Sequence, residues 1–506
     1  MLRYLLSRPL GAFLFSAVIA APLVFGLALT KGLSHDEHQH VAAGALLAHE
    51  GLLPYVDYPH FHTPYLAFVY GLIFRATDHL LLGARLFSAA CAAAIVGVMG
   101  MIAAQALRER DSRVRHAGVL GAVLLCLSSA VFARTTGKAW NQEPALLCAL
   151  LAFIALLAAL PEARRVRMAV AGLLLGLAIG FRITYAPLVA PFALAIFLAP
   201  ATRERWLSSF LCLATGLAVA LAGVGWFFAV APEQTFFGNF EFAQVNVTYR
   251  FATGDPRTMT ILKKLRYVWK EIIRTDAGLA LAFFVPISAA FMAARASAAR
   301  LSVELRVLLW TLPFLLIGSL APSPMFEQYF YPFVPWLILG AIFALAAIPA
   351  RSPWFRRGAW GAAAAVLLSL GMGVRWFRDF DDVFRPAKWA PIEIHAKSEP
   401  MRGQAGRGRV LTLAPLFPLE AGCRIYPAFA TGPFAWRIAP FMDAAKAARL
   451  KMVVPATLPQ LLDADPPAAM LTGHEERGEE LLSDYAAKHG YRRLAGPGDE
   501  ELWVRP

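Results

Sequence analysis

The sequence predicts an α-helical polytopic membrane protein with a small α/β domain at its C-terminal end. Hydrophobic residues make up 58% of the 506 positions and charged residues only 16%, and the mean hydropathy is +0.54. Soluble globular domains carry about 25% charged residues. Most arginines stand in short clusters between apolar runs, so we attribute the net charge of +14 to membrane topology and expect no nucleic-acid partner.

Apolar runs long enough to cross a bilayer recur along the first 375 residues. A hydrocarbon core needs about 20 apolar residues per helix. The first run, 9–30, is longer than the apolar core of a typical signal peptide and lacks a clear small-residue cleavage site, so we expect a retained first helix. In all we expect about eleven transmembrane helices, near residues 9–30, 80–106, 116–133, 142–160, 168–183, 185–200, 207–231, 277–296, 304–321, 329–349 and 357–375.

Arginine clusters predict the orientation of these helices. They fall in alternate short connections, at 108–115, 164–167, 203–205, 295–306 and 351–357. The positive-inside rule makes that side cytoplasmic, and with it the N-terminus. We therefore expect a multi-pass inner-membrane protein with a transmembrane domain at 1–375. Its outer loops 31–79 and 232–276 and an α/β domain at 376–506 would face the periplasm.

The first outer loop carries the most unusual polar cluster of the chain, His35-Asp36-Glu37-His38-Gln39-His40. Acidic groups at a membrane boundary are costly and indicate a functional site by default. A helix is expected from Asp36 to Ala48, ending at Gly51, and a second, more apolar helix over 61–74 with Pro64 near its start.

Two carboxylates in this cluster are candidate catalytic groups. Asp36 and Glu37 each share a helix face with His40, so helical spacing alone leaves both as candidates. The alternative for Asp36 is a helix N-terminal cap. The order of the histidines does not match HExxH, so a structural metal is disfavoured, whereas a divalent ion with His62 among its ligands stays an open alternative.

Other polar residues are expected on the same outer side. Glu143 precedes Pro144 at a helix start and is either a second acid or a cap. Arg182 separates two short spans, and a charged turn at that depth indicates a cavity. Tyr329 lies in a polar turn that either lines the cavity or forms part of an interfacial aromatic belt. The third outer loop adds three cations that suit a phosphate or lipid headgroups, Lys263, Lys264 and Arg266.

An ordered set of short motifs carries a family resemblance. They are Asp36-Glu37, residues 51–55 with 61–64, Glu143-Pro144, residues 180–182 and residues 328–332. In this order, and on one side of the membrane, the sequence resembles the GT-C glycosyltransferases, the class that includes the aminoarabinose transferases and the protein O-mannosyltransferases. The resemblance implies an inverting transferase of GT-C architecture that moves a sugar from a polyprenyl-phosphate donor.

The resemblance also implies roles for single residues. Asp36 takes the place of the general base and Glu143 that of the family's second acid, while Arg182 and Tyr329 match residues near the donor phosphate. Where the aminoarabinose transferases carry a Glu-Lys-Pro-Pro run, this chain has His62-Thr63-Pro64-Tyr65, which lacks both the carboxylate and the lysine. No cofactor other than a divalent metal ion is suggested. The expected partners are the lipid-linked sugar donor, the bilayer, and an envelope glycolipid, polysaccharide or protein as acceptor.

The tail after 376 predicts short strands at 409–413, 468–472 and 502–504 and a helix over 478–489 closed by Gly490. Two other functions fit the composition. One is a transporter or flippase for lipid-linked sugars, and the other a non-catalytic binding partner in envelope polysaccharide assembly. A transporter is expected to show related halves and deeply placed charges, whereas here the polar residues gather on one side and no internal repeat is evident.

Overall fold

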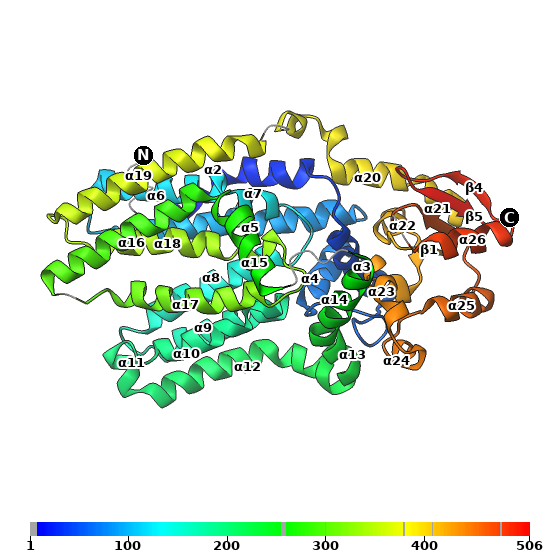
Figure 1. Ribbon diagram of the computed structural model, residues 1–506, viewed down its shortest axis with the longest axis horizontal. Coiled ribbons are helices and arrows are strands. Elements are labelled where there is room, and N and C mark those ends of the chain that lie inside the picture. The colour runs from blue at the N-terminus through cyan, green and yellow to red at the C-terminus, as the bar shows by residue number, and fades with distance from the viewer. Residues whose placement is uncertain (1–7, 255–259, 299, 378–379, 407, 476–477) are drawn as a thin grey trace.

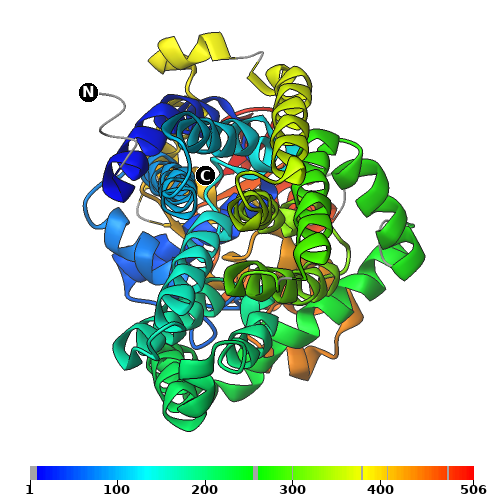
Figure 2. The ribbon, with the colours of Figure 1, turned by 90° about the vertical axis from the view of Figure 1, so that its left-hand side faces the viewer.

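A computed structural model of the chain describes residues 8–254, 260–298, 300–377, 380–406, 408–475 and 478–506. Long helices run along the longest axis of the molecule, and a small sheet lies beyond one end of this bundle (Figure 1). Figure 2 looks along the helices, with the strands of the C-terminal part behind them. The helices α3 (His35–Glu50) and α4 (Tyr65–Phe74) lie at the end of the bundle that faces the C-terminal part.

Eight helices in the described part of the chain are long and apolar enough to cross a membrane. This confirms the predicted class of multi-pass membrane protein. They are α2 (Pro9–Thr30), α5 (Leu80–Ala106), α8 (Gln142–Ala159), α12 (Trp206–Val230), α16 (Ala277–Ser297), α17 (Val303–Leu320), α18 (Phe333–Ala347) with the 3₁₀ turn η4 (Glu327–Phe330) before it, and α19 (Pro353–Gly373).

The three remaining predicted spans form shorter helices. Two have 17 residues each, at the lower limit of about 17 to 25 for a spanning helix. The third begins after Arg182, whose extended backbone (φ −155°, ψ 113°) ends the preceding helix, and it consists of a 3₁₀ helix that continues into a short α-helix. These elements are α6 (Ser112–Ser128) followed by α7 (Ala130–Thr135), α9 (Arg165–Phe181), and η1 (Ile183–Leu188) joined to α10 (Val189–Ala195); α11 (Pro200–Glu204) leads on to α12.

Two helices follow the first membrane helix, as expected. α3 (His35–Glu50) starts after Ser34, whose backbone N–H donates to Glu37 Oε2 at 2.9 Å, and ends at Gly51, whose φ of 70° suits a glycine cap. α4 (Tyr65–Phe74) begins four residues later than the predicted position 61. Proline disfavours the α conformation in the residue before it, so the helix starts only after Pro64.

The long connection 232–276 is mostly helical in its described residues. The three predicted cations lie on a short α-helix that is followed by a π-helical turn. The elements are α13 (Pro232–Phe236), the π turn η2 (Phe237–Glu241), α14 (Phe242–Ala252), α15 (Ile261–Tyr267) and the π turn η3 (Val268–Ile273).

The C-terminal part is built around a five-stranded sheet of order β2-β1-β3-β5-β4. β1 pairs in parallel with β2 and β3, and β5 is antiparallel to β3 and β4. The three predicted strands are β1 (Arg409–Thr412), β3 (Ala469–Thr472) and β5 (Glu501–Val504). β2 (Arg424–Ile425) has two residues and β4 (Arg492–Ala495) is mostly exposed, so neither shows a hydrophobic pattern.

Short helices surround this sheet. The predicted helix over 478–489 is α26 (Glu480–Lys488), and Gly490 follows it with a φ of 71°. Three short 3₁₀ helices, η5 (Val374–Phe377), η6 (Phe380–Phe384) and η7 (Pro386–Lys388), lead from α19 to this part of the chain, and η6 packs on α2. The other short helices are α20 (Ala390–Ser398), α21 (Pro400–Ala405), α22 (Leu416–Glu420), η8 (Pro427–Phe429), α23 (Pro433–Ile438), η9 (Ala439–Phe441), α24 (Ala444–Arg449), η10 (Pro455–Thr457) and α25 (Leu458–Ala464). The division into 1–375 and 376–506 stays a prediction.

The C-terminal part packs directly on the outer helices. Leu416, Leu419 and Ile425 belong to the same buried apolar cluster as the membrane helices. The backbone N–H of Leu416 donates to His38 Nδ1 at 3.3 Å, and that of Leu81 donates to Glu420 Oε1 at 2.6 Å. The start of α3 is therefore enclosed by the C-terminal part as well as by the bundle.

Candidate active site

Glu37 is a buried anchor between elements. Its side chain has no exposed surface, and Arg85 of α5 binds it with both prongs of the guanidinium, Nε to Oε1 at 2.7 Å and Nη2 to Oε2 at 2.8 Å. The N–H of Ala139 also donates to Oε1, at 2.7 Å. Burial alone would raise the pKa of Glu37, but Arg85 and the hydrogen bonds from Arg85, Ala139 and Ser34 outweigh it and hold this pKa below its ordinary value.

Arg85 also closes the end of the first membrane helix. Its Nη1 donates to the carbonyls of Ala28 (3.0 Å) and Lys31 (2.6 Å), and its Nη2 donates to that of Gly32 (3.0 Å). The last carbonyls of a helix lack partners within the helix and need donors of this kind. Both oxygens of Glu37 and most donors of Arg85 are thus used to fix α2, α3 and the loop at 137–141.

Asp36 has the opposite surroundings. Its side chain is partly exposed and makes no hydrogen bond with the described residues. Ser34 is the N-cap of α3, so the alternative that Asp36 caps this helix is wrong. Burial raises the pKa of Asp36, and the positive charges of Lys138 and Arg182 oppose that rise. The result is an accessible carboxylate whose affinity for a proton is higher than usual.

Lys138 lies on a loop held tightly against α2. Gly137 has a φ of 93°, and a Cβ there would stand 2.7 Å from the backbone nitrogen of Ala28. This position requires glycine both for its backbone angle and for the close approach. The Lys138 ammonium lies 5.1 Å from the ring centroid of Trp140 and is only partly exposed.

Arg182 contacts both the polar turn before Glu143 and the turn that carries Tyr329. Its Nη1 donates to Asn141 Oδ1 at 2.9 Å and its Nε to Thr184 Oγ1 at 3.1 Å. Its guanidinium also lies over the ring of Tyr329, 5.0 Å from the centroid. Two residues that were predicted separately as site residues are thus in contact, and the contact places a cation beside the partly exposed aromatic ring.

Glu143 lies beneath the surface rather than beside Asp36 on an open face. Its side chain has no exposed surface, and Oε1 accepts from the N–H of Gly137 at 3.0 Å. Oε2 has no hydrogen-bond partner among the described residues. Glu143 therefore supports the loop that carries Lys138, and a catalytic role for it stays a prediction.

The rings of three histidines, His40, His60 and His62, are packed together near the start of α3. The ring centroids of His40 and His62 are 4.7 Å apart, and those of His60 and His62 are 6.3 Å apart. Burial lowers the pKa of His40 to about 3 and that of His60 to about 4, so both imidazoles are neutral at pH 7. Within the described ranges, this trio does not bring three donor atoms within metal-binding distance of one another. A metal role of His62 stays a prediction.

The three predicted loop cations are divided by their surroundings. Lys264 is buried, and its ammonium donates to the carbonyls of Leu320 and Pro322, the latter at 2.8 Å. It closes the end of α17 and is thereby engaged away from a phosphate. Lys263 and Arg266 have exposed side chains on the same helix, α15, where contact with lipid headgroups is equally open to them.

Lys138, Asn141 and Arg85 are the site residues that sequence reasoning left without a role. Arg85 gave the clearest signal, since it is an arginine inside the apolar run 80–106, and a charge placed there requires a partner. Lys138 and Asn141 belong to the polar turn before Glu143 and carry no pattern of their own.

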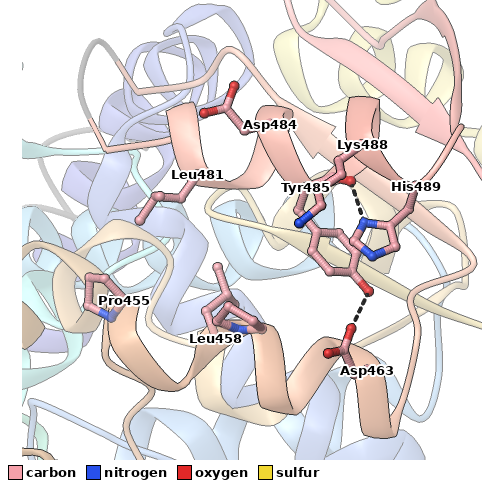
Figure 3. A pocket seen from close by; sticks show the side chains of 9 residues that line it. Pro455, Leu458, Asp463, Leu481, Asp484, Tyr485, Lys488 and His489 are labelled. Carbon is pink, nitrogen blue, oxygen red and sulfur yellow. Dashed lines mark hydrogen bonds between the residues drawn. The ribbon is translucent and has the colours of Figure 1, made fainter.

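Two cavities lie apart from these residues. One, of ≈ 250 Å³, lies between α25 and α26, where Tyr485 donates to Asp463 and stacks on His489 (Figure 3). The other, of ≈ 660 Å³, lies among the arginine-rich connections, with Arg108, Arg110 and Arg167 in its wall. Neither includes Asp36.

Comparisons with known proteins concern the fold and one segment of the chain. Residues 61–227 match the family of dolichyl-phosphate-mannose-protein mannosyltransferases, a segment that includes Lys138 and Arg182. No curated protein sequence matches the chain significantly. Among solved structures, the chain is similar to ArnT from Cupriavidus metallidurans bound to undecaprenyl phosphate, with a TM-score of 0.59, 15% identity and 97% of each chain covered. The apo state of that protein gives 0.59, 14% and 97% of each chain.

The fold of the chain is ArnT-like over nearly its whole length, with the helical bundle followed by a small C-terminal sheet, and the segment 61–227 matches the mannosyltransferase family.

Proposed function

We propose that the chain transfers a sugar from a polyprenyl-phosphate donor to an acceptor hydroxyl outside the cytoplasm, with Asp36 as the general base. The observation that carries the proposal is an accessible carboxylate, free of hydrogen bonds to the described residues and influenced by two cations, Lys138 and Arg182. The fold likeness to ArnT supports a lipid-phosphate donor, because the solved protein holds undecaprenyl phosphate.

Asp36 is suited to remove the proton of the acceptor. Its raised pKa makes it a stronger base than an ordinary aspartate, and its partial exposure lets a hydroxyl reach it. The acceptor oxygen forms the new bond to the anomeric carbon while its proton moves to Asp36. Attack from the face opposite the leaving group inverts that carbon.

Arg182 and Lys138 are suited to support the leaving group. As the bond between the anomeric carbon and the donor oxygen breaks, its electron pair stays on the phosphate, whose charge rises. Fixed cations stabilise such a charge best when they are already oriented. Asn141 and Thr184 orient the Arg182 guanidinium, and its contact with Tyr329 covers one face of it.

Glu37 and Glu143 act as positioning residues in this proposal. Glu37 fixes the first turn of α3, and Glu143 fixes the loop at Gly137. Neither side chain has exposed surface, so an acceptor does not touch them. The site would face the periplasmic side of an inner membrane, in line with the arginine clusters of the opposite connections.

The test is transfer in membranes that carry the Asp36→Asn variant. Envelope glycolipids, polysaccharides and proteins are compared by mass spectrometry with and without the chain, which identifies the product. The variant is expected to lose roughly 10²- to 10⁴-fold in transfer rate at normal expression. Asp78→Asn, an exposed acid in the same outer loop, is the matched control and should transfer normally. Full transfer by Asp36→Asn would rule out the proposed base.

A further inference from the structure

A second cluster of ligating side chains lies one residue before Asp36, where the C-terminal part meets α3. His35 of α3 and His474 and Glu475 of the C-terminal part each offer a donor atom, and these atoms lie within 4.8 Å of one another. The imidazole rings of His35 and His474 are 5.0 Å apart. None of these residues takes part in the transfer step proposed above.

His474 is oriented as a ligand. Its Nδ1 lies 3.4 Å from Glu500 Oε1, which places the proton on Nδ1 and leaves a lone pair on Nε2. That Nε2 is buried and has no hydrogen-bond partner among the described residues. A carboxylate behind the remote nitrogen of an imidazole is the usual support of a metal-binding histidine. The turn itself is fixed, because the N–H groups of Gly473 and His474 both donate to Glu479 Oε2.

Glu475 is oriented in the same way. Arg437 binds its Oε2 through Nε at 3.0 Å and through Nη2. Its Oε1 is buried, lacks a hydrogen bond to the described residues, and points toward His35, whose Nδ1 is 3.4 Å away. A buried carboxylate oxygen without a donor is costly, so an unpartnered oxygen beside an unpartnered imidazole nitrogen indicates a missing cation.

We propose that His35, His474 and Glu475 bind a divalent transition metal of the zinc type that links the C-terminal part to the start of α3. Two imidazoles and one carboxylate form a known zinc ligand set that leaves a fourth position for water. With bonds of about 2.0 to 2.1 Å, neighbouring ligand atoms of a tetrahedral zinc are about 3.3 Å apart. The distance between His35 Nδ1 and Glu475 Oε1 is 3.4 Å.

His38 is adjacent to this cluster but is not one of its ligands. Its ring centroid is 4.7 Å from that of His474. However, its Nδ1 accepts the N–H of Leu416, so the proton of the neutral ring is on Nε2 and no free lone pair remains. His35 completes the set instead, and its side chain is 52% exposed, which gives the ion a path to solvent.

The site would control how firmly the C-terminal part encloses Asp36. His35 precedes Asp36 directly in the first turn of α3, so a metal bond to His35 fixes that turn from the outer side, as Arg85 fixes it from the inner side. The inference concerns metal binding and holds whether or not the transfer proposal is correct.

The test uses the full chain in detergent, purified with a tag that contains no histidine and treated with a chelator. Zn²⁺ is titrated by calorimetry, and the bound metal is counted by elemental analysis after gel filtration. One Zn²⁺ per chain is expected, with a rise in thermal unfolding temperature. His35→Ala should lose this ion, and Glu500→Gln should weaken its binding roughly 10- to 100-fold. No stoichiometric binding by the unmodified chain would overturn the proposal.

Two further variants keep the assignment specific. His489→Ala removes an exposed imidazole of the same C-terminal part and should bind Zn²⁺ normally. His62→Ala tests the group of His40, His60 and His62. Retention of the ion by His35→Ala together with its loss from His62→Ala would place the metal elsewhere and refute the proposed site. Because His35 is half-exposed, its variant is expected to fold, which an unchanged gel-filtration profile in chelator verifies.

Discussion

Asp36 and Glu37 are neighbours in the chain, yet their carboxylates have opposite surroundings. The buried Glu37 carboxylate accepts two hydrogen bonds from the Arg85 guanidinium. Asp36 is partly exposed, and Lys138 and Arg182 influence it only through their charge. Adjacent positions on a helix point about 100° apart, which suffices to separate them. One residue step therefore separates a buried ion pair from a partly exposed carboxylate without a hydrogen bond to the described residues.

The charge of Lys138 should be visible in the pH dependence of transfer. Burial raises the pKa of Asp36, and Lys138 lowers it. A base acts only when deprotonated, so activity rises with pH through this pKa. Lys138→Met removes the lowering charge and should move the acid limb of the kcat/KM profile to higher pH. The measurement is made in the presence of a chelator so that no metal binds His35. An acid limb that stays at the same pH or moves to lower pH in the variant would contradict this prediction.

Removing the charge of Glu37 should lower the stability of the fold as well as the rate of transfer. Glu37→Gln leaves Arg85 buried without its counter-ion, and breaking such a pair costs about 3 to 5 kcal/mol. We expect a large drop in thermal unfolding temperature, measured in detergent. Glu50→Gln at the C-terminal end of the same helix breaks a pair with Arg424, whose side chain is 53% exposed and stays hydrated without its partner, and is the control. Equal melting of both variants would exclude the anchoring role.

At the scale of elements, the loop at 137–141 packs on α2, so the position of α2 sets the position of Lys138. Gly137→Ala would place a Cβ 2.7 Å from the Ala28 nitrogen and force an alanine to a φ of 93°. We expect a loss of about 1 to 3 kcal/mol and a fall in transfer because Lys138 moves. Gly371→Ala, where no atom lies within 4 Å of the added Cβ, should be neutral or stabilising. Thermal unfolding and transfer rates of the two variants make the comparison, and normal transfer by Gly137→Ala would disprove the coupling.

The elements also show what the sequence could and could not predict. Apolar runs and caps such as Gly51 located the membrane helices and α3, because those signals are local. The split roles of Asp36 and Glu37 depend on Arg85, which lies 48 residues away along the chain. The contact of His35 with His474 joins residues from the two ends of the chain, so no local pattern reveals it.

At the scale of the whole molecule, docking of the C-terminal part rests on apolar burial more than on charge. Leu416 is fully buried in the cluster shared with the membrane helices. The ion pair between Arg449 and Glu233, by contrast, joins side chains that are 57% and 42% exposed. Solvent and salt weaken pairs of that kind.

Leu416→Ala should therefore loosen the docking where Arg449→Ala does not. Truncating a buried leucine costs about 2 to 5 kcal/mol, and here the loss falls on the seam between α22 and α3. We expect faster hydrogen exchange at α3 and α22, and easier proteolysis of the C-terminal part, in Leu416→Ala alone. High salt should leave the unmodified chain docked. Undocking by salt, or by Arg449→Ala to the same extent, would mean that charge holds the C-terminal part over Asp36.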